Sequence, residues 1–171
     1  MESDVRTAKS IIMLILAVAS IAIGQPQAPV PEATLIVKTI AGQPVKLGPL
    51  DFAKLPPAHV SATDHDGKKH EYDGVNLRDL LAQVGVVTGD GLRGKEMADY
   101  VVAEASDGYR VVFSMAELDP AFANTQVIVA QRMDGQLLQP REDPMRLVVP
   151  GDKRQARWVR MLTSISVMRA Q

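Results

Sequence analysis

The chain has 171 residues, a formal net charge of −1 and no cysteine. A length of this order predicts one domain, and a nearly neutral charge argues against nucleic acid as a partner. Without cysteine the chain can form no disulfide, offer no thiolate to a reaction or a metal, and carry no lipid on a cysteine. Apolar burial must therefore stabilise the domain.

The first 24 residues are typical of a signal peptide. Arg6 and Lys9 precede an apolar run over residues 11–23, which is shorter than the roughly 20 residues that span a bilayer. We expect cleavage after Gly24, with Ala28 as the alternative site, and membrane contact only through a leader that stays uncleaved. Its removal takes away two acidic and two basic residues, so the net charge stays at −1. The sequence thus predicts a periplasmic or secreted protein.

The segment 25–33 is rich in proline and is predicted to be an extended lead-in to a domain over residues 34–171. A first hairpin is expected from residues 34–40 and 45–47. Residues 51–55 are predicted to form one helical turn, which two consecutive prolines close.

Three Asp-Gly pairs follow, at residues 66–67, 107–108 and 134–135. Asp-Gly favours the tight turns of antiparallel hairpins, because both positions accept a positive φ angle. The predicted strands are 59–65 with 68–72, 100–106 with 109–113, and 127–133 with 136–138. Residues 127–130 lack polar alternation and are predicted to be buried on both faces.

Two helices carry capping signals. Asn76 is predicted to cap a helix that runs through Val84 and stops at Gly85. Ser114 and Glu117 form the capping box of a shorter helix. With closing strands at 147–149 and 164–168, the sequence predicts an α+β domain of mostly antiparallel or mixed sheets with two or three short helices.

The three histidines are close in sequence. A two-residue turn at 66–67 would place His59, His65 and His70 on one face of the hairpin, with the last two about 7 Å apart. Asp64, His65 and His70 are thus weak candidates for a metal site. Two histidines beside two lysines make a poor site, so a solvated hairpin tip is favoured.

The segment 150–160 is the most basic of the chain. It holds Lys153, Arg154, Arg157 and Arg160 beside the only tryptophan, Trp158. Such a loop can hold an anionic group through charge-assisted hydrogen bonds, with the indole as a stacking wall. The alternative is a solvated basic loop over a core tryptophan.

Three segments in order, YDGVNLRDLL (72–81), DGYRVVFS (107–114) and RLVVPG (146–151) continuing to RWVR (157–160), resemble the molybdopterin-binding oxidoreductase domain of the sulfite oxidase superfamily. The resemblance covers residues 34–168. It implies an α+β fold of mixed sheets and a pterin cofactor. It also implies that Lys153, Arg154 and Arg157 hold the pterin phosphate, with Trp158 packed behind them.

The chain departs from this family where the metal would bind. Catalytic members ligate molybdenum through a cysteine, but the corresponding stretch 60–65 contains no thiol, and a carboxylate does not reproduce soft thiolate ligation. Asp64 is the one candidate replacement there, and we expect it to be exposed. The leader also lacks the arginine pair of folded export, so a chain exported unfolded would leave its cofactor behind.

Three hypotheses follow. The first is a non-redox binding module, without cofactor, for a small anionic ligand or a partner protein. The second is a molybdopterin-dependent oxidoreductase that ligates its metal through Asp64 or holds its cofactor without a covalent bond. The third is a structural or interaction domain whose basic loop is only surface.

Overall fold

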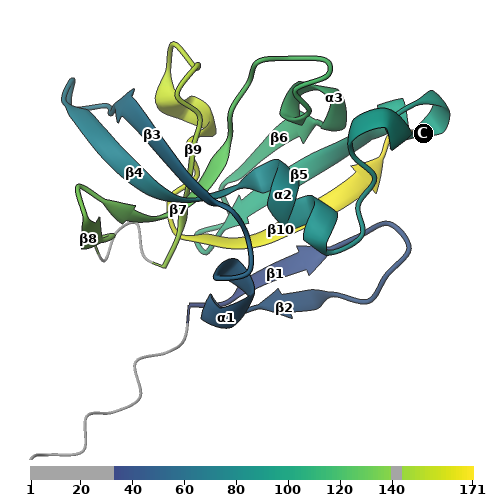
Figure 1. The fold of residues 1–171 in the computed structure, drawn as a ribbon, viewed down its shortest axis with the longest axis horizontal. Helices are drawn as coiled ribbons and strands as arrows, with labels where there is room; N and C mark the ends of the chain where they lie inside the picture. The colour runs from purple at the N-terminus through teal and green to yellow at the C-terminus, as the bar shows by residue number, and fades with distance from the viewer. Residues whose placement is uncertain (1–32, 140–143) are drawn as a thin grey trace, which may run out of the picture. The chain divides into compact units, whose positions relative to one another are not determined.

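Ten strands, three short α-helices and three 3₁₀ helices make up the described part of this computed structural model, residues 33–139 and 144–171 (Figure 1). The predicted signal peptide and the lead-in up to residue 32 lie outside the described residues. In chain order the elements are β1 Leu35–Lys38, β2 Val45–Leu47, α1 Pro49–Phe52, β3 Pro57–Thr63, β4 Lys69–Asn76, α2 Leu77–Gln83, η1 Gly89–Gly91, η2 Gly94–Ala98, β5 Asp99–Ala105, β6 Arg110–Ser114, α3 Met115–Leu118, β7 Ile128–Met133, β8 Gln136–Leu137, β9 Arg146–Val148, η3 Gln155–Arg157 and β10 Leu162–Arg169.

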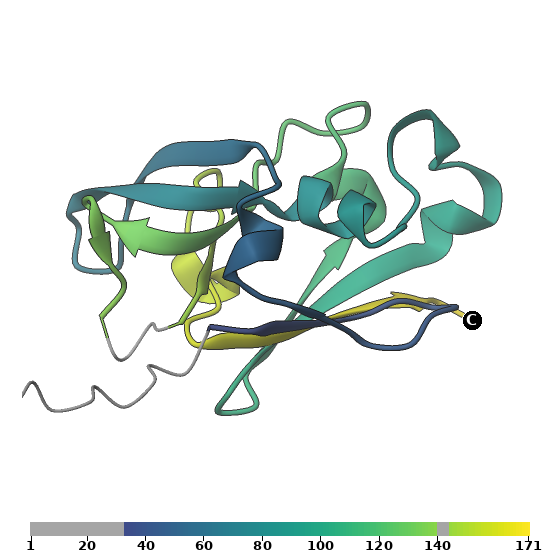
Figure 2. The same ribbon diagram turned by 60° about the horizontal axis from the view of Figure 1, so that its bottom comes forward.

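The strands form two five-stranded sheets. In the first the order is β2-β1-β10-β5-β6, and in the second it is β3-β4-β7-β8 with β9 also paired to β7. All pairs are antiparallel except β1 with β10, which run parallel although they lie at opposite ends of the domain sequence (Figure 2). The fold is α+β with one mixed sheet and one antiparallel sheet, which agrees with the mostly antiparallel or mixed sheets that the sequence predicts.

The three Asp-Gly hairpins are confirmed, but only one has the predicted two-residue turn. At β7–β8, Asp134 and Gly135 both have positive φ, 52° and 75°, and Met133 pairs with Gln136. At β3–β4, Asp64 donates its backbone N–H to Lys68 O, and residues 65–67 form a three-residue loop. The β5–β6 loop is also three residues long, because Ala105 N donates to Tyr109 O.

This longer loop shifts the register of the β3–β4 hairpin by one residue. His70 lies opposite Ala62 rather than Thr63, whereas His59 lies opposite Asp73. Successive side chains point to opposite faces of a strand, so His70 and His59 are on different faces. The prediction that all three histidines share one face is therefore wrong.

The helices begin and end close to their predicted positions. In α3 the capping box is present, with Ser114 N donating to Glu117 Oε1 at 2.7 Å and Glu117 N to Ser114 Oγ at 3.1 Å. Asn76 is the N-cap residue of α2, but its side chain makes no capping hydrogen bond. The predicted turn at 51–55 is instead α1, which begins two residues earlier with a proline in its first turn.

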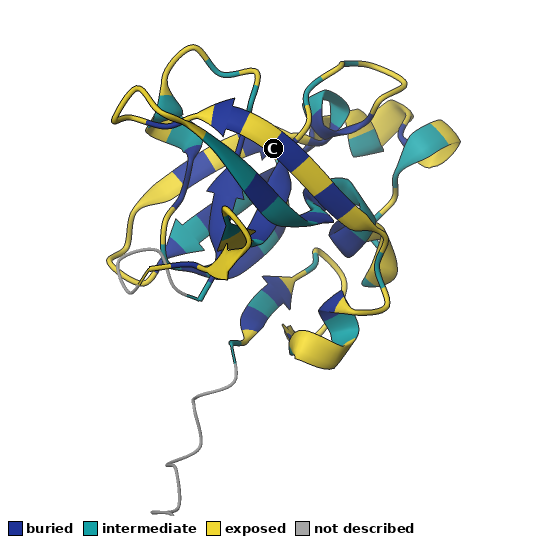
Figure 3. Ribbon diagram, turned by 60° about the vertical axis from the view of Figure 1, so that its left-hand side comes forward, coloured by how far each residue is buried: buried dark blue, intermediate teal, exposed yellow. Residues whose placement is uncertain are grey.

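One apolar cluster takes side chains from both sheets and from α2. Buried residues alternate with exposed ones along β3 (Figure 3) and with partly buried ones along β5, whereas residues 127–130 are all buried, as predicted. Within residues 33–139 and 144–171, no helix has the length and apolar composition needed to cross a membrane.

Candidate functional site

A pocket of about 500 Å³ lies where three loops meet. Its lining comes from the β3–β4 loop, from the β5–β6 loop with its flanking residues, from the first residue of β9, and from the end of the segment between β9 and β10. Antiparallel hairpins bring loops of distant sequence to one edge, which is where small-molecule sites are commonly built. We take this pocket as the candidate site.

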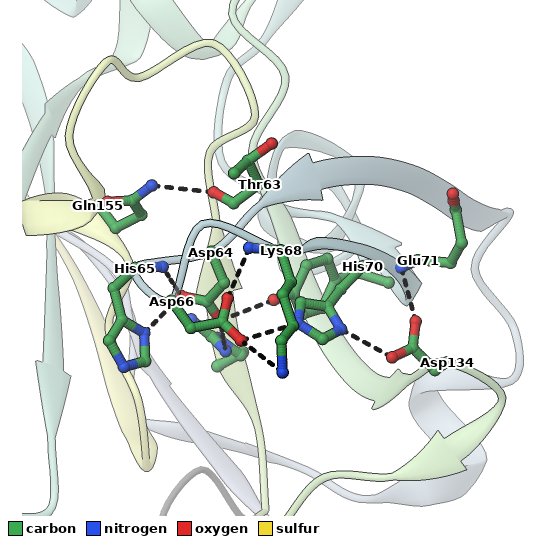
Figure 4. Close-up of polar contacts among 11 residues, drawn as sticks. Thr63, Asp64, His65, Asp66, Lys68, His70, Glu71, Asp134 and Gln155 are labelled. Atoms are coloured by element: carbon green, nitrogen blue, oxygen red, sulfur yellow. Dashed lines mark hydrogen bonds and ion pairs between the residues drawn. The ribbon is translucent and has the colours of Figure 1, made fainter.

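Asp64 forms the floor of the pocket, and it is buried, which corrects the expectation that it is exposed. Its Oδ2 accepts hydrogen bonds from Tyr72 Oη and Arg146 Nη1, both at 2.9 Å. Its Oδ1 accepts the backbone N–H of His65 at 2.6 Å, and the His65 Nδ1 lies 2.8 Å away, as Figure 4 shows in part. A carboxylate has about four acceptor positions, so these four donors occupy them.

The charge of Asp64 is fixed by these contacts. Burial acting alone would raise the pKa of Asp64, but hydrogen bonds from His65 and the adjacent guanidinium of Arg146 hold that pKa far below its usual range. Because an ionised carboxylate only accepts, the His65 Nδ1 must carry the proton of their shared hydrogen bond. Asp64 is therefore a buried anion whose oxygens are already engaged.

Two aromatic rings enclose the guanidinium of Arg146, which is 2% exposed. Its Cζ lies 5.3 Å from the ring centre of Tyr72 and 5.4 Å from that of Trp158, within cation–π range. The rings of Tyr72 and Trp158 pack edge to face, with their centres 5.9 Å apart. Trp158 Nε1 donates a hydrogen bond to Val149 O at 2.9 Å. Trp158 thus packs behind the basic loop, but as a buried, hydrogen-bonded residue beneath the pocket.

Two hydrogen bonds hold the η3 segment over the pocket. Gln155 Nε2 donates to Thr63 O at 2.9 Å (Figure 4), and Tyr109 Oη donates to Ala156 O at 2.6 Å. One bond reaches the end of β3 and the other the start of β6. These bonds attach the η3 segment to both neighbouring hairpins.

The predicted basic residues separate into three groups. Arg160 lines the pocket and is exposed. Lys153 and Arg154 are exposed but do not line it. Arg157 is turned into the protein, where its guanidinium bonds to Asp152 and Glu117.

Arg157 is held by carboxylates on both sides. Its Nε and Nη2 donate to Asp152 at 3.0 and 2.7 Å, its Nη1 donates to Glu117 Oε2 at 2.9 Å, and its Cζ lies 4.7 Å from the ring centre of Phe113. The hydrogen bonds to Asp152 are the main reason that the pKa of Arg157 is raised. These contacts give Arg157 a role in fixing the loop to α3, which differs from the phosphate contact that the resemblance implies.

The histidines bond to carboxylates in a way that does not suit a metal. His59 Nδ1 is 2.7 Å from Asp73 and its Nε2 is 3.0 Å from Glu71. His70 Nδ1 is likewise 2.7 Å from Asp134 (Figure 4). The two carboxylates contact different nitrogens of the His59 ring. The ring and both carboxylates therefore do not converge on one position where a metal ion could bind. Among the described residues, no group of three or more His, Asp or Glu side chains could hold a metal ion.

Four polar residues of the pocket were not singled out as candidates from the sequence, namely Arg146, Asp107, Tyr109 and Gln155. Arg146 had a usable signal, because an arginine that opens an apolar strand must find an acidic partner if it is buried. The other three depend on how the loops meet, which no local pattern reveals.

The geometry defines an α+β domain with one mixed sheet, one antiparallel sheet and a pocket lined mainly by loop residues. A family model described as "Oxidoreductase molybdopterin binding domain" matches residues 51–171. The chain therefore belongs to the oxidoreductase molybdopterin-binding domain family. A comparison with curated protein sequences gave no match.

Among solved structures, the chain is similar to the sulfane dehydrogenase SoxCD from Paracoccus pantotrophus, with a TM-score of 0.61 and 21% sequence identity. The similarity covers 79% of this chain but only 38% of that one. At this identity the likeness shows the fold alone, and it agrees with the fold that the sequence predicts.

The residues of the pocket do not fit a molybdenum–pterin group. No thiolate is available, and Asp64, the carboxylate in the stretch where catalytic relatives carry cysteine by resemblance, has its oxygens engaged. Two arginines and two aspartates line the pocket, so their formal charges cancel and they offer no net positive charge to a phosphate. We derive no chemistry through that cofactor.

Proposed function

We propose that this protein is a non-redox binding module that takes a small ligand with an anionic group in the pocket above Asp64. The observation that carries the proposal is the set of four donors on Asp64. A metal at Asp64 would have to displace at least one of these donors, and displacing Arg146 would leave a buried arginine without its carboxylate.

Two features of the pocket favour ligand binding over a surface without a binding role. Arg160 lines it and forms no ion pair or side-chain hydrogen bond with a described residue, so its guanidinium is available to an anionic group. The η3 segment is already held in place, which lowers the ordering cost of binding. These two features favour a binding module over a domain whose basic loop is only surface, although a partner protein could supply the anionic group.

We also propose that the protein acts outside the cytoplasm as a periplasmic or secreted domain, without nucleic acid as a partner. The support is the leader, with Arg6 and Lys9 before an apolar run and no arginine pair. General secretory export carries unfolded chains, which agrees with a domain that needs no cofactor to fold.

The competing function is a molybdopterin-dependent oxidoreductase with a non-cysteine ligand. Purified domain from a host that makes the cofactor should have the same thermal midpoint as domain from a host that cannot, because a native-state ligand stabilises by mass action. A higher midpoint from the cofactor-producing host would contradict the proposal. Small carboxylates added to either preparation are expected to raise the midpoint, and Arg160→Gln should remove this effect.

A further inference from the structure

The charges that line the pocket are not all neutralised by other residues of the described chain. Asp64 and Arg146 compensate each other at the floor, at 2.9 Å. The other two, Asp107 and Arg160, are exposed, and neither forms an ion pair with another residue of the described chain. The pocket therefore presents one uncompensated negative and one uncompensated positive side chain.

Asp107 and Arg160 belong to segments that are bonded to each other. Ser106 N donates to Met161 O at 2.9 Å, so the β5–β6 loop and the start of β10 lie side by side. Each charged residue is the immediate sequence neighbour of one end of this hydrogen bond. Their charged groups nevertheless do not come within ion-pair distance, which leaves a gap that a ligand can bridge.

Apolar side chains line the same pocket. Ala105, Ala156, Met161 and the indole of Trp158 all contribute to its wall. A ligand that fills the pocket must therefore carry an apolar body as well as charge. Inorganic phosphate or sulfate would leave these walls wet and would be repelled by Asp107.

We propose that the ligand is a zwitterion whose carboxylate and ammonium groups are separated by an apolar spacer, with the carboxylate at Arg160 and the ammonium at Asp107. Arginine suits the carboxylate because its planar donors can pair with both oxygens. The ammonium relieves the repulsion that a plain anion meets at Asp107. This inference rests on the proposed function, since it specifies the ligand of the same pocket.

Three small probes of matched length test the inference by calorimetry at low salt. They are 6-aminohexanoate, which carries both charges, hexanoate, which carries only the carboxylate, and hexylamine, which carries only the ammonium. Exposed ion pairs are worth little individually, so the zwitterion should bind about two- to fivefold more tightly than either single-charge probe. The preference should shrink as the salt concentration rises.

Two variants test which residue binds each charged group of the ligand. Asp107→Asn keeps the oxygen that accepts Tyr109 N at 3.0 Å, so the loop should persist while the zwitterion falls to the affinity of hexanoate. Arg160→Gln should weaken both carboxylate probes and leave hexylamine unchanged. Arg154→Gln, an exposed charge that does not line the pocket, is the matched control and should change nothing.

The outcomes separate this inference from the proposed function. If hexanoate binds as tightly as 6-aminohexanoate, or if Asp107→Asn tightens the zwitterion, the inference is wrong while an anion site remains. If neither carboxylate probe nor inorganic phosphate binds the wild type, both the inference and the proposed anion site are wrong. Binding of the zwitterion alone, lost in both pocket variants, supports both.

Discussion

Asp64 and Arg146 form a buried ion pair across 82 residues of sequence, with Arg146 Nη1 2.9 Å from Asp64 Oδ2. The pair joins the end of β3 to the start of β9, and it occupies the floor of the pocket. Removing one member of such a pair leaves a buried charge without its partner. We expect Arg146→Met to lower the free energy of unfolding by about 3–5 kcal/mol.

A double-mutant cycle with Asp64→Leu and Arg146→Met measures this coupling. The double variant should be much less destabilised than the sum of the single variants, because an apolar pair removes both charges together. Additive losses in urea unfolding would mean that the two residues do not act as a pair.

The same carboxylate predicts how stability depends on acid. The pKa of Asp64 is lower in the folded protein than in the unfolded chain. The ionised carboxylate therefore stabilises the fold at pH values above its pKa in the unfolded chain, and this stabilisation is lost as the pH falls toward its pKa in the folded protein. Comparing the wild type with Asp64→Asn, the stability difference should be largest near neutrality and should shrink below about pH 4. A difference that grows on acidification would contradict the assignment.

Arg157 is expected to matter for stability more than for ligand binding. Its guanidinium bonds to Asp152 and Glu117 and is 32% exposed, so Arg157→Gln should cost about 1–2 kcal/mol of unfolding free energy. Arg157→Lys should rescue only part of this loss, because an ammonium cannot make the two parallel bonds to Asp152. The affinity for carboxylate probes, measured below the unfolding transition, should stay within error. A loss of affinity with unchanged stability would restore Arg157 as a ligand contact.

His70 joins the β3–β4 hairpin to the β7–β8 turn. Its hydrogen bond to Asp134 is the main reason that its pKa is raised, with Asp66 contributing from the other side. A histidine whose pKa is raised by folding stabilises the fold at pH values below its pKa in the unfolded chain. This stabilisation is lost as the pH rises through its pKa in the folded protein. The destabilisation caused by His70→Gln should thus be greater at pH 5.5 than at pH 8.5, by up to about 1 kcal/mol. Equal losses at both pH values would show that the charge of His70 does not contribute.

Gly74 lies at a register shift between β4 and β7, where the strands approach closely. A Cβ at this position would lie 2.0 Å from Val129 O, a backbone atom that cannot rotate away. Gly74→Ala should therefore destabilise by about 3 kcal/mol or prevent folding. Gly151→Ala is the control, because a Cβ there meets nothing within 4 Å. Similar unfolding midpoints for the two variants would contradict the close packing.

The elements set by local chemistry could be predicted from the sequence, because Asp-Gly pairs and the Ser114–Glu117 capping box act within a few residues. The register of β3–β4 could not, since Asp66-Gly67 fits a two-residue or a three-residue loop equally well. This difference of one residue in loop length decides which face of the hairpin carries His70. The parallel pairing of β1 with β10 and the pairing of Asp64 with Arg146 join distant segments, so no local pattern reveals them.

We propose that this member of the family works without molybdenum. The most direct test is the content of molybdenum and pterin per chain in the protein purified from a host that makes the cofactor, with a catalytic family member prepared in parallel. We expect background levels of both in this protein and stoichiometric levels in the control. One molybdenum and one pterin per chain would show instead that the domain holds the cofactor.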